Sequence, residues 1–202
     1  SFMDTLFLEK MKGQEAYLTA MKGRMRGTRN KQPVAPRDAK IAYQVYMAEP
    51  DFVRSDGDIY GKGAVVLHTL RYLLGDKAFF KALRRMSYPT KEMEKITGGK
   101  QTRFVNTDDF KQIAEEESGM KLDWFFEIYL RQSVLPKLIV ETMGDRTDLR
   151  WETPNNLPFS MPIDISVDGK IQRVEMKDSK GIVMSKGGKI EVDPKGWVLK
   201  AQ

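Results

Sequence analysis

Residues 60–71 read YGKGAVVLHTLR, and residues 74–79 continue with LGDKAF. The apolar residues recur at intervals of three and four, which is the spacing of one face of an α-helix. Gly75 follows the last of them, and glycine is common directly after a helix because it tolerates a left-handed backbone. The stretch therefore predicts a helix that begins near Tyr60 and stops at Gly75. The apolar pattern of residues 79–86 predicts a second helix after it.

Further helices are predicted on the N-terminal side of this stretch. Five large apolar residues at helical spacing are expected to form one buried face: Phe2, Met3, Leu6, Phe7 and Met11. Gly13 is expected to end this helix, and residues 15–25 suit a second one. A basic cluster interrupted by glycines is expected to be a solvated linker: Arg24, Arg26, Arg29 and Lys31. A short element ending at Pro50 is indicated by three residues: Ile41, Val45 and Tyr46.

On the C-terminal side, Asn106 and the acidic residues after it mark a helix start. Short polar side chains accept hydrogen bonds from free amides there, and carboxylates meet the positive end of the helix. The helix is expected to end at Ser118-Gly119, and the Pro- and Gly-containing residues 88–101 before it are expected to form a loop. A last apolar helix is expected over residues 122–130. Its aromatic residues could suggest a ligand platform, but their helical spacing favours a place in the core: Trp124, Phe125, Phe126 and Tyr129.

After Pro136 the pattern changes to short β-branched runs. They predict strands over residues 138–140, 163–167, 171–176, 182–184 and 190–192. Asp168-Gly169 stands between two of these runs and is typical of a two-residue hairpin turn. Such regularly spaced strands predict a small antiparallel β-sandwich. We therefore expect an α+β, multi-domain chain with a helical domain over residues 1–135 and a sandwich domain over residues 136–202.

The composition excludes several kinds of site. Of 202 residues, 34 are Lys or Arg and 28 are Asp or Glu, one is histidine and none is cysteine. Disulfides and thiolate metal sites are therefore impossible, and zinc sites built mainly of imidazole are excluded. The net charge of +6 is spread along the chain, so no nucleic-acid partner is expected. No run reaches the roughly 18 apolar residues that a membrane span needs. The sequence does not indicate a compartment.

Four stretches carry a recognisable local sequence. They are residues 60–71 with LGD at 74–76, NTDDF at 106–110 with LDWFF at 122–126, LPFSMPI at 157–163, and VDPKGWVL at 192–199. In this order they resemble the aminopeptidase N family of zinc metallopeptidases, which are gluzincin aminopeptidases. The resemblance implies the helical C-terminal part of a thermolysin-like catalytic domain, followed by the small β-sandwich of the family.

The same resemblance implies a zinc cofactor and peptide substrates. The family binds zinc through an H-E-x-x-H helix and a later glutamate, and no H-E-x-x-H occurs in this sequence. We therefore expect the chain to be a C-terminal fragment of such an enzyme, with no zinc bound to it and no activity alone. Tyr60 matches the tyrosine of the family's Y-x-K-G motif, which implies a catalytic role in stabilising the oxyanion of the reacting peptide. The alternative for Tyr60 is a half-buried helix residue with a solvated hydroxyl.

Other candidates are given structural interpretations. His68 has no second ligand at helical spacing and is expected to be structural. Lys62 is expected to have a structural or surface role, and the two glycines beside it are expected to allow close helix packing. Residues 115–117, three glutamates, could suggest a metal site but are expected to form a solvated face.

Two wider expectations follow. A fragment cut from a larger domain should expose apolar surface at Phe2, Leu6 and Phe7 and could self-associate there. The alternative function is a non-catalytic interaction module, helices plus sandwich, that has lost the metal site of the family.

Overall fold

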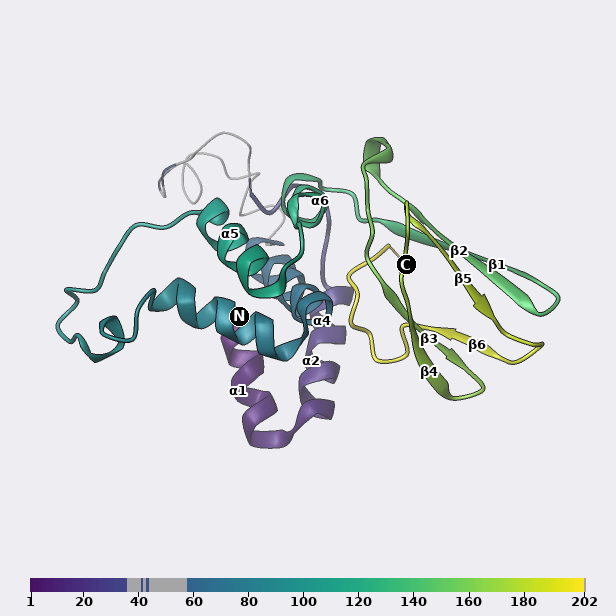
Figure 1. Ribbon diagram of the computed structural model, residues 1–202, viewed down its shortest axis with the longest axis horizontal. Helices are drawn as coiled ribbons and strands as arrows, with labels where there is room; N and C mark the ends of the chain where they lie inside the picture. The colour runs from purple at the N-terminus through teal and green to yellow at the C-terminus, as the bar shows by residue number, and fades with distance from the viewer. Residues whose placement is uncertain (36–40, 42, 44–57, 202) are drawn as a thin grey trace.

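The computed structural model describes residues 1–35, 41, 43 and 58–201 (Figure 1). Helices precede two small antiparallel sheets, so the α+β prediction is confirmed. The helices form one side of the molecule and the sheets the other (Figure 1). Among the described residues, none of the helices combines the length and apolar character that crossing a membrane requires. The short element predicted at residues 41–50 lies almost wholly outside the described residues.

The chain opens with two helices, α1 (Phe2–Lys12) and α2 (Gln14–Arg26), separated at Gly13 as predicted. Arg24 and Arg26 of the basic cluster belong to the last turn of α2, so the prediction of a linker fails for these two residues.

The predicted buried face of α1 is largely wrong. Phe2 is buried and Leu6 partly buried, but three of the five residues are about two-thirds exposed: Met3, Phe7 and Met11. One face of the helix, which includes Phe2 and Thr5, is buried against the core, and Phe2 packs edge-on against Phe79 there. The neighbouring apolar stripe, formed by the three exposed residues, faces away from the core. Spacing alone does not distinguish two adjacent stripes. The expected exposure of apolar surface therefore holds for Phe7 and fails for Phe2.

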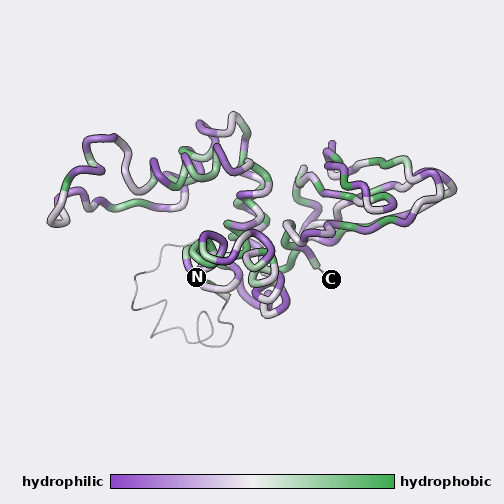
Figure 2. Tube along the Cα trace, turned by 90° about the horizontal axis from the view of Figure 1, so that it is seen from below, coloured by the Kyte–Doolittle hydropathy of each residue, from purple (hydrophilic) through white to green (hydrophobic). Residues whose placement is uncertain are grey.

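Residues 60–79 lie within α4 (Asp58–Ser87), which is broken at Gly75. Gly75 has φ 74° and ψ 157°, so the chain leaves the helical path there and resumes a second helical segment. Beyond it, residues 88–106 hold only a short 3-10 turn, η2 (Met93–Lys95), and extend away from the rest of the molecule at the left of Figure 2. The predicted loop is thus confirmed apart from that turn.

Two further helices complete the helical part. Helix α5 (Thr107–Ser118) begins with a reciprocal capping box between Asn106 and Asp109 and ends at Gly119 in the left-handed conformation, as predicted. Helix α6 (Asp123–Phe126) continues into a π-helical turn, η3 (Glu127–Arg131). The aromatic residues of this segment are mainly core, as predicted, because Phe125 and Tyr129 are fully buried and Tyr129 lies against Phe159.

The C-terminal part holds two three-stranded antiparallel sheets. In the first the order is β1 (Lys137–Met143), β2 (Arg146–Glu152) and β5 (Lys180–Met184). In the second it is β4 (Lys170–Val174), β3 (Ile163–Val167) and β6 (Ile190–Val192). A 3-10 turn, η4 (Pro154–Asn156), lies on the connection between the sheets. The hairpin predicted at Asp168-Gly169 is confirmed, since both residues have positive φ and Val167 pairs with Lys170.

Strand β2 was not among the predicted strands, although it is the central strand of its sheet. Charged residues dominate its sequence, RTDLRWE, and hide its alternation. The alternating residues Thr147, Leu149 and Trp151 are buried, and this period of two was the signal available in the sequence.

The buried apolar residues of the helices and of both sheets form one cluster. Residues 193–201, here called the C-terminal segment, run from the sheets back to the helices. Tyr129 donates a hydrogen bond to the Leu199 carbonyl, and Thr69 donates one to the Trp197 carbonyl. The proposed division into domains at residue 136 stays a prediction.

Candidate functional site

Tyr60 is the third residue of α4 and lies in its first turn. Its side chain is 53% exposed although the residues that follow it are mostly buried. The first N–H groups of a helix have no intrahelical acceptor and carry partial positive charge. The phenol therefore stands at the end of a helix where developing negative charge is favoured.

Lys62, two residues further on, is fully buried, with 0% exposure. Its ammonium group donates hydrogen bonds to the carbonyl oxygens of Gln132 and Ser133, at 3.3 and 3.1 Å. A buried ammonium group is costly unless it is hydrogen-bonded. Of the two roles considered for Lys62, the structural one is confirmed and the surface one is wrong.

The glycines on either side of Lys62 do not show the close packing predicted for them. A Cβ atom at Gly61 or Gly63 would meet no heavy atom within 4 Å among the described residues, the backbone of α4 itself aside. Their effect on the helix is instead to weaken it, because glycine loses more conformational entropy on folding than alanine does.

His68 is fully buried, and both of its ring nitrogens are hydrogen-bonded. Nε2 lies 3.0 Å from the Gly196 carbonyl oxygen, which can only accept, so Nε2 carries the proton. Nδ1 then accepts from the Tyr17 hydroxyl at 2.7 Å. Burial lowers the pKa of His68 to about 4, so the ring is neutral at pH 7. These contacts agree with the structural interpretation of His68.

His68 lies where α4 contacts the C-terminal segment, and two further residues, Arg71 and Trp197, lie beside it. Trp197 stacks on the His68 ring with centroids 4.7 Å apart. The guanidinium group of Arg71, 4% exposed, donates to both carboxylate oxygens of Glu9 and of Asp76, at 2.6 to 3.1 Å. The Arg71 hydrogen bond holds the pKa of Asp76 below its usual value. The sequence pattern did not indicate the pairing with Glu9, because Glu9 lies on α1, far from Arg71 along the chain.

The three glutamates of α5 do not form the solvated face predicted for them. Glu117 is only 7% exposed and pairs with Arg85 and Lys81, while Glu116 is more exposed and also pairs with Arg85. Glu115 accepts from the backbone N–H of Leu122 at 2.7 Å. Two of these carboxylates therefore attach α5 to the second segment of α4, and the third holds the start of α6.

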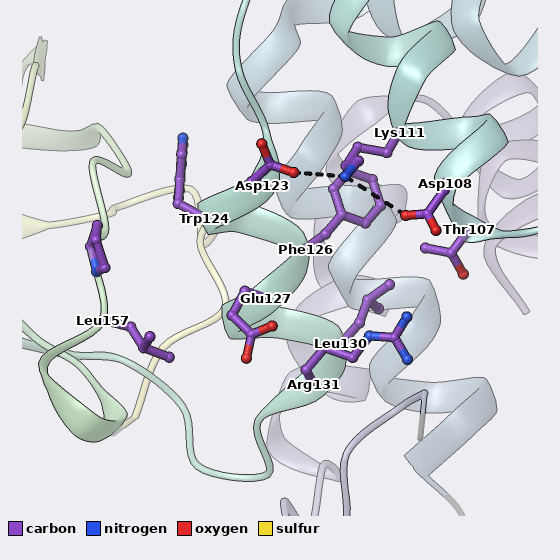
Figure 3. Close-up of a pocket in the computed structure, with 11 residues that line it drawn as sticks. Thr107, Asp108, Lys111, Asp123, Trp124, Phe126, Glu127, Leu130, Arg131 and Leu157 are labelled. Atoms are coloured by element: carbon purple, nitrogen blue, oxygen red, sulfur yellow. Dashed lines mark hydrogen bonds and ion pairs between the residues drawn. The ribbon is translucent and has the colours of Figure 1, made fainter. Parts of the chain in front are cut away.

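A hollow of about 560 Å³ lies between α5, the α6–η3 segment and Leu157-Pro158 (Figure 3). This volume is within the range of small-molecule sites. Three of its charged groups pair with one another: the Lys111 ammonium group lies 2.6 Å from Asp123 and 3.7 Å from Asp108. Tyr60 is not among the residues that line it, so the hollow and the tyrosine are separate features.

Among the described residues, no group of three or more His, Cys, Asp or Glu side chains is arranged to hold a metal ion. The residues of this chain that the structure describes therefore do not supply the zinc site that the family resemblance implies.

Comparison with known proteins finds a similarity in structure but none in sequence. No family profile matches the sequence, and no curated protein matches it. Among solved structures, the fold matches the crystal structure of Legionella pneumophila aminopeptidase A in complex with aspartic acid, with a TM-score of 0.57 and 18% sequence identity. The match covers 94% of this chain and 21% of that one, so the chain spans about a fifth of that protein's length.

This likeness concerns the fold. The fold of this chain is similar to that of a segment of that aminopeptidase. Membership of the aminopeptidase N family and a catalytic role for Tyr60 stay predictions.

Proposed function

We propose that this chain forms part of the catalytic unit of a zinc-dependent aminopeptidase, which removes N-terminal residues from peptides. In this proposal Tyr60 is its catalytic residue, and the isolated chain is inactive. The observation that carries the proposal is the match of nearly the whole chain to a segment of an aminopeptidase, with the motif tyrosine exposed at the start of a buried helix.

The role of Tyr60 follows from the chemistry of peptide hydrolysis. Negative charge develops on the carbonyl oxygen in the transition state, and a phenol O–H donor near that oxygen stabilises the transition state more than the substrate. The partial positive charge at the start of a helix favours the same charge, and Tyr60 lies in the first turn of α4. An exposed hydroxyl is required for such contact, and Tyr60 has an exposed side chain.

The zinc ion would be held by residues outside this sequence. The described residues do not fit a zinc site, so no step of the reaction is assigned to a metal on this chain. What the chain would contribute is the donor on Tyr60 and the helices that hold it in place.

The test uses the full-length protein translated from the gene that encodes this chain. Substituting Tyr60→Phe should lower kcat for an aminoacyl anilide about 10²- to 10³-fold, the usual cost of losing one oxyanion donor. Tyr88→Phe is the matched control, because Tyr88 is also an exposed tyrosine and follows the end of the same helix. Its activity should equal that of the unsubstituted protein.

Two outcomes would oppose the proposal. A full-length protein that neither binds zinc nor cleaves the anilide favours the non-catalytic interaction module. An active protein whose Tyr60→Phe variant keeps full kcat removes Tyr60 from the reaction.

A further inference from the structure

The first turn of α4 has features that weaken a helix, although the rest of the segment before Gly75 is mostly buried. Two glycines, Gly61 and Gly63, lie in or next to it, and each lowers helix stability compared with alanine. Neither has a close neighbour among the described residues at the place where a side chain would be. A helix end of this kind tends to fray, because its first N–H groups also lack helical partners. Tyr60 lies within this turn, so its position depends on whatever holds the turn.

Lys62 lies between the two glycines and, at 0% exposure, is fully buried. Its ammonium group reaches the carbonyl oxygens of two consecutive residues, Gln132 and Ser133. A methionine or leucine would fill a buried site at lower desolvation cost. What a lysine offers at this position, and an apolar side chain does not, is its hydrogen bonds to these two carbonyl groups.

The acceptors of Lys62 belong to a segment that is itself held on both sides. Just before it, the carbonyl oxygen of Leu130 accepts from the N–H of Ala35 at 2.9 Å. Just after it, the Pro136 carbonyl oxygen accepts from the N–H of Ala201 at 2.9 Å. Residues 130–136 are thus tied to the segment after α2 and to the C-terminal segment. Lys62 is thus bonded to a segment that has backbone hydrogen bonds on both sides.

The geometry of the helix relates this anchor to Tyr60. Residues two apart on an α-helix point about 200° from each other, because each residue turns the helix by about 100°. Lys62 therefore points inward where Tyr60 points outward, in agreement with exposures of 0% and 53%. Holding Lys62 fixes the rotation of the first turn and with it the direction of the Tyr60 side chain.

We infer that Lys62 is a positioning residue for Tyr60, holding the first turn of α4 against the carbonyl groups of Gln132 and Ser133. This inference rests on the proposed function, in which Tyr60 is the donor to the oxyanion. A peptide bond to be hydrolysed must meet the phenol at a defined distance, and a misplacement of 1 Å can cost about 10²-fold in rate.

The first experiment measures hydrogen exchange in this chain by NMR and needs no activity. The amides of residues 62–65 bond to carbonyl groups of residues 58–61, so their exchange reports on the first turn. In Lys62→Met these amides should exchange about 10-fold faster, while those of residues 66–74 keep their protection. Lys77→Met is the control, because Lys77 is exposed on the second segment of the same helix, and it should change neither set. Unchanged protection at residues 62–65 would overturn the inference, and so would equally faster exchange along the whole helix.

The second experiment is a double-mutant cycle in the full-length protein, with kcat and KM measured for Tyr60→Phe, Lys62→Met and the double variant. Lys62→Met alone should lower kcat about 10- to 100-fold with little change in KM. In the Tyr60→Phe background it should lower kcat no further, because there is no phenol left to position. Lys62→Arg, which keeps cationic donors, should recover part of the lost kcat.

The cycle separates the two proposals. If Tyr60→Phe leaves kcat unchanged, the proposed function fails, whatever the exchange experiment gives. If Tyr60→Phe lowers kcat and the effect of Lys62→Met is equally large in both backgrounds, Lys62 is only structural and this inference fails.

Discussion

The two segments of α4 are attached to the rest of the protein in opposite ways. Before Gly75, the polar side chains of the helix are buried. Lys62, His68 and Thr69 hydrogen-bond to backbone groups or to the Tyr17 hydroxyl, and Arg71 pairs with the carboxylates of Glu9 and Asp76. After Gly75, the polar attachments are ion pairs nearer the surface, such as Arg84 with Glu94 and Arg85 with Glu117.

The difference indicates that the segment before Gly75 is held more rigidly than the segment after it. Buried hydrogen bonds are directional and are costly to break, because their partners remain unsatisfied. Ion pairs at the surface contribute little and are screened by salt. The segment that carries the candidate catalytic residue is thus the one held by the less adjustable contacts.

The largest expected effect comes from removing Arg71. Arg71→Met leaves Glu9 without its buried partner, and we expect the free energy of unfolding to fall by about 3 to 5 kcal/mol. Urea unfolding followed by circular dichroism measures this. Arg84→Met is the control in the second segment, where the arginine is 68% exposed and the loss should stay below about 1 kcal/mol. Equal losses in the two variants would remove the contrast between the segments.

The next effect is a dependence of stability on pH that originates at His68. The pKa of His68 is lowered from 6.5 to about 4 in the folded chain, so below pH 6.5 the unfolded chain binds the proton more readily. The contribution of His68 to the free energy of unfolding is fully present above about pH 6.5 and is lost as the pH falls toward 4. It amounts to roughly 3 kcal/mol over that range.

A variant isolates the histidine from the acidic groups that titrate in the same range. His68→Gln should be less stable at pH 7, yet should lose roughly 3 kcal/mol less between pH 7 and pH 4 than the unsubstituted chain. Urea titrations at a series of pH values give both slopes. Parallel slopes would mean that the folded chain accommodates a protonated imidazole.

The smallest effect is expected in the second segment. Arg85→Met should cost less than about 1 kcal/mol at low salt, because Arg85 and Glu116 are partly exposed and the more buried Glu117 keeps Lys81 as a partner. In 1 M NaCl, where the Debye length is about 3 Å, the variant and the unsubstituted chain should be nearly equal in stability. The cost of Arg71→Met should persist in the same salt, and its disappearance would contradict the buried character of that network.

The predictions made from the sequence succeed where the signal is local. The capping box of Asn106, the end of α5 at Gly119 and the hairpin at Asp168-Gly169 each depend on the conformational preferences of a few adjacent residues. The predictions fail where the partners are distant. Strand β2 was missed because charged residues on its outer face mask the buried ones.

For the residues of the candidate site, too, the predictions succeed where the signal is local and fail where the partners are distant. The sequence singled out Tyr60 through its motif and correctly assigned a structural role to His68. It did not indicate that Lys62 is fully buried, since its acceptors lie 70 residues away at Gln132 and Ser133. It also mistook the glutamates of α5 for a solvated face, because Glu116 and Glu117 find their partners on α4 and Glu115 accepts from the N–H of Leu122.

The sequence by itself determined the order of the helices and of every strand except β2, the places where most of them start and stop, and the motif that contains Tyr60. These follow from backbone preferences and short-range periodicity, which need no distant partner. The tertiary structure alone decided which stripe of α1 is buried, which nitrogen of His68 carries the proton, and where the Lys62 ammonium group finds its acceptors. Burial and hydrogen bonding at these positions depend on residues that only folding brings together, so their outcome is set by packing rather than by local pattern.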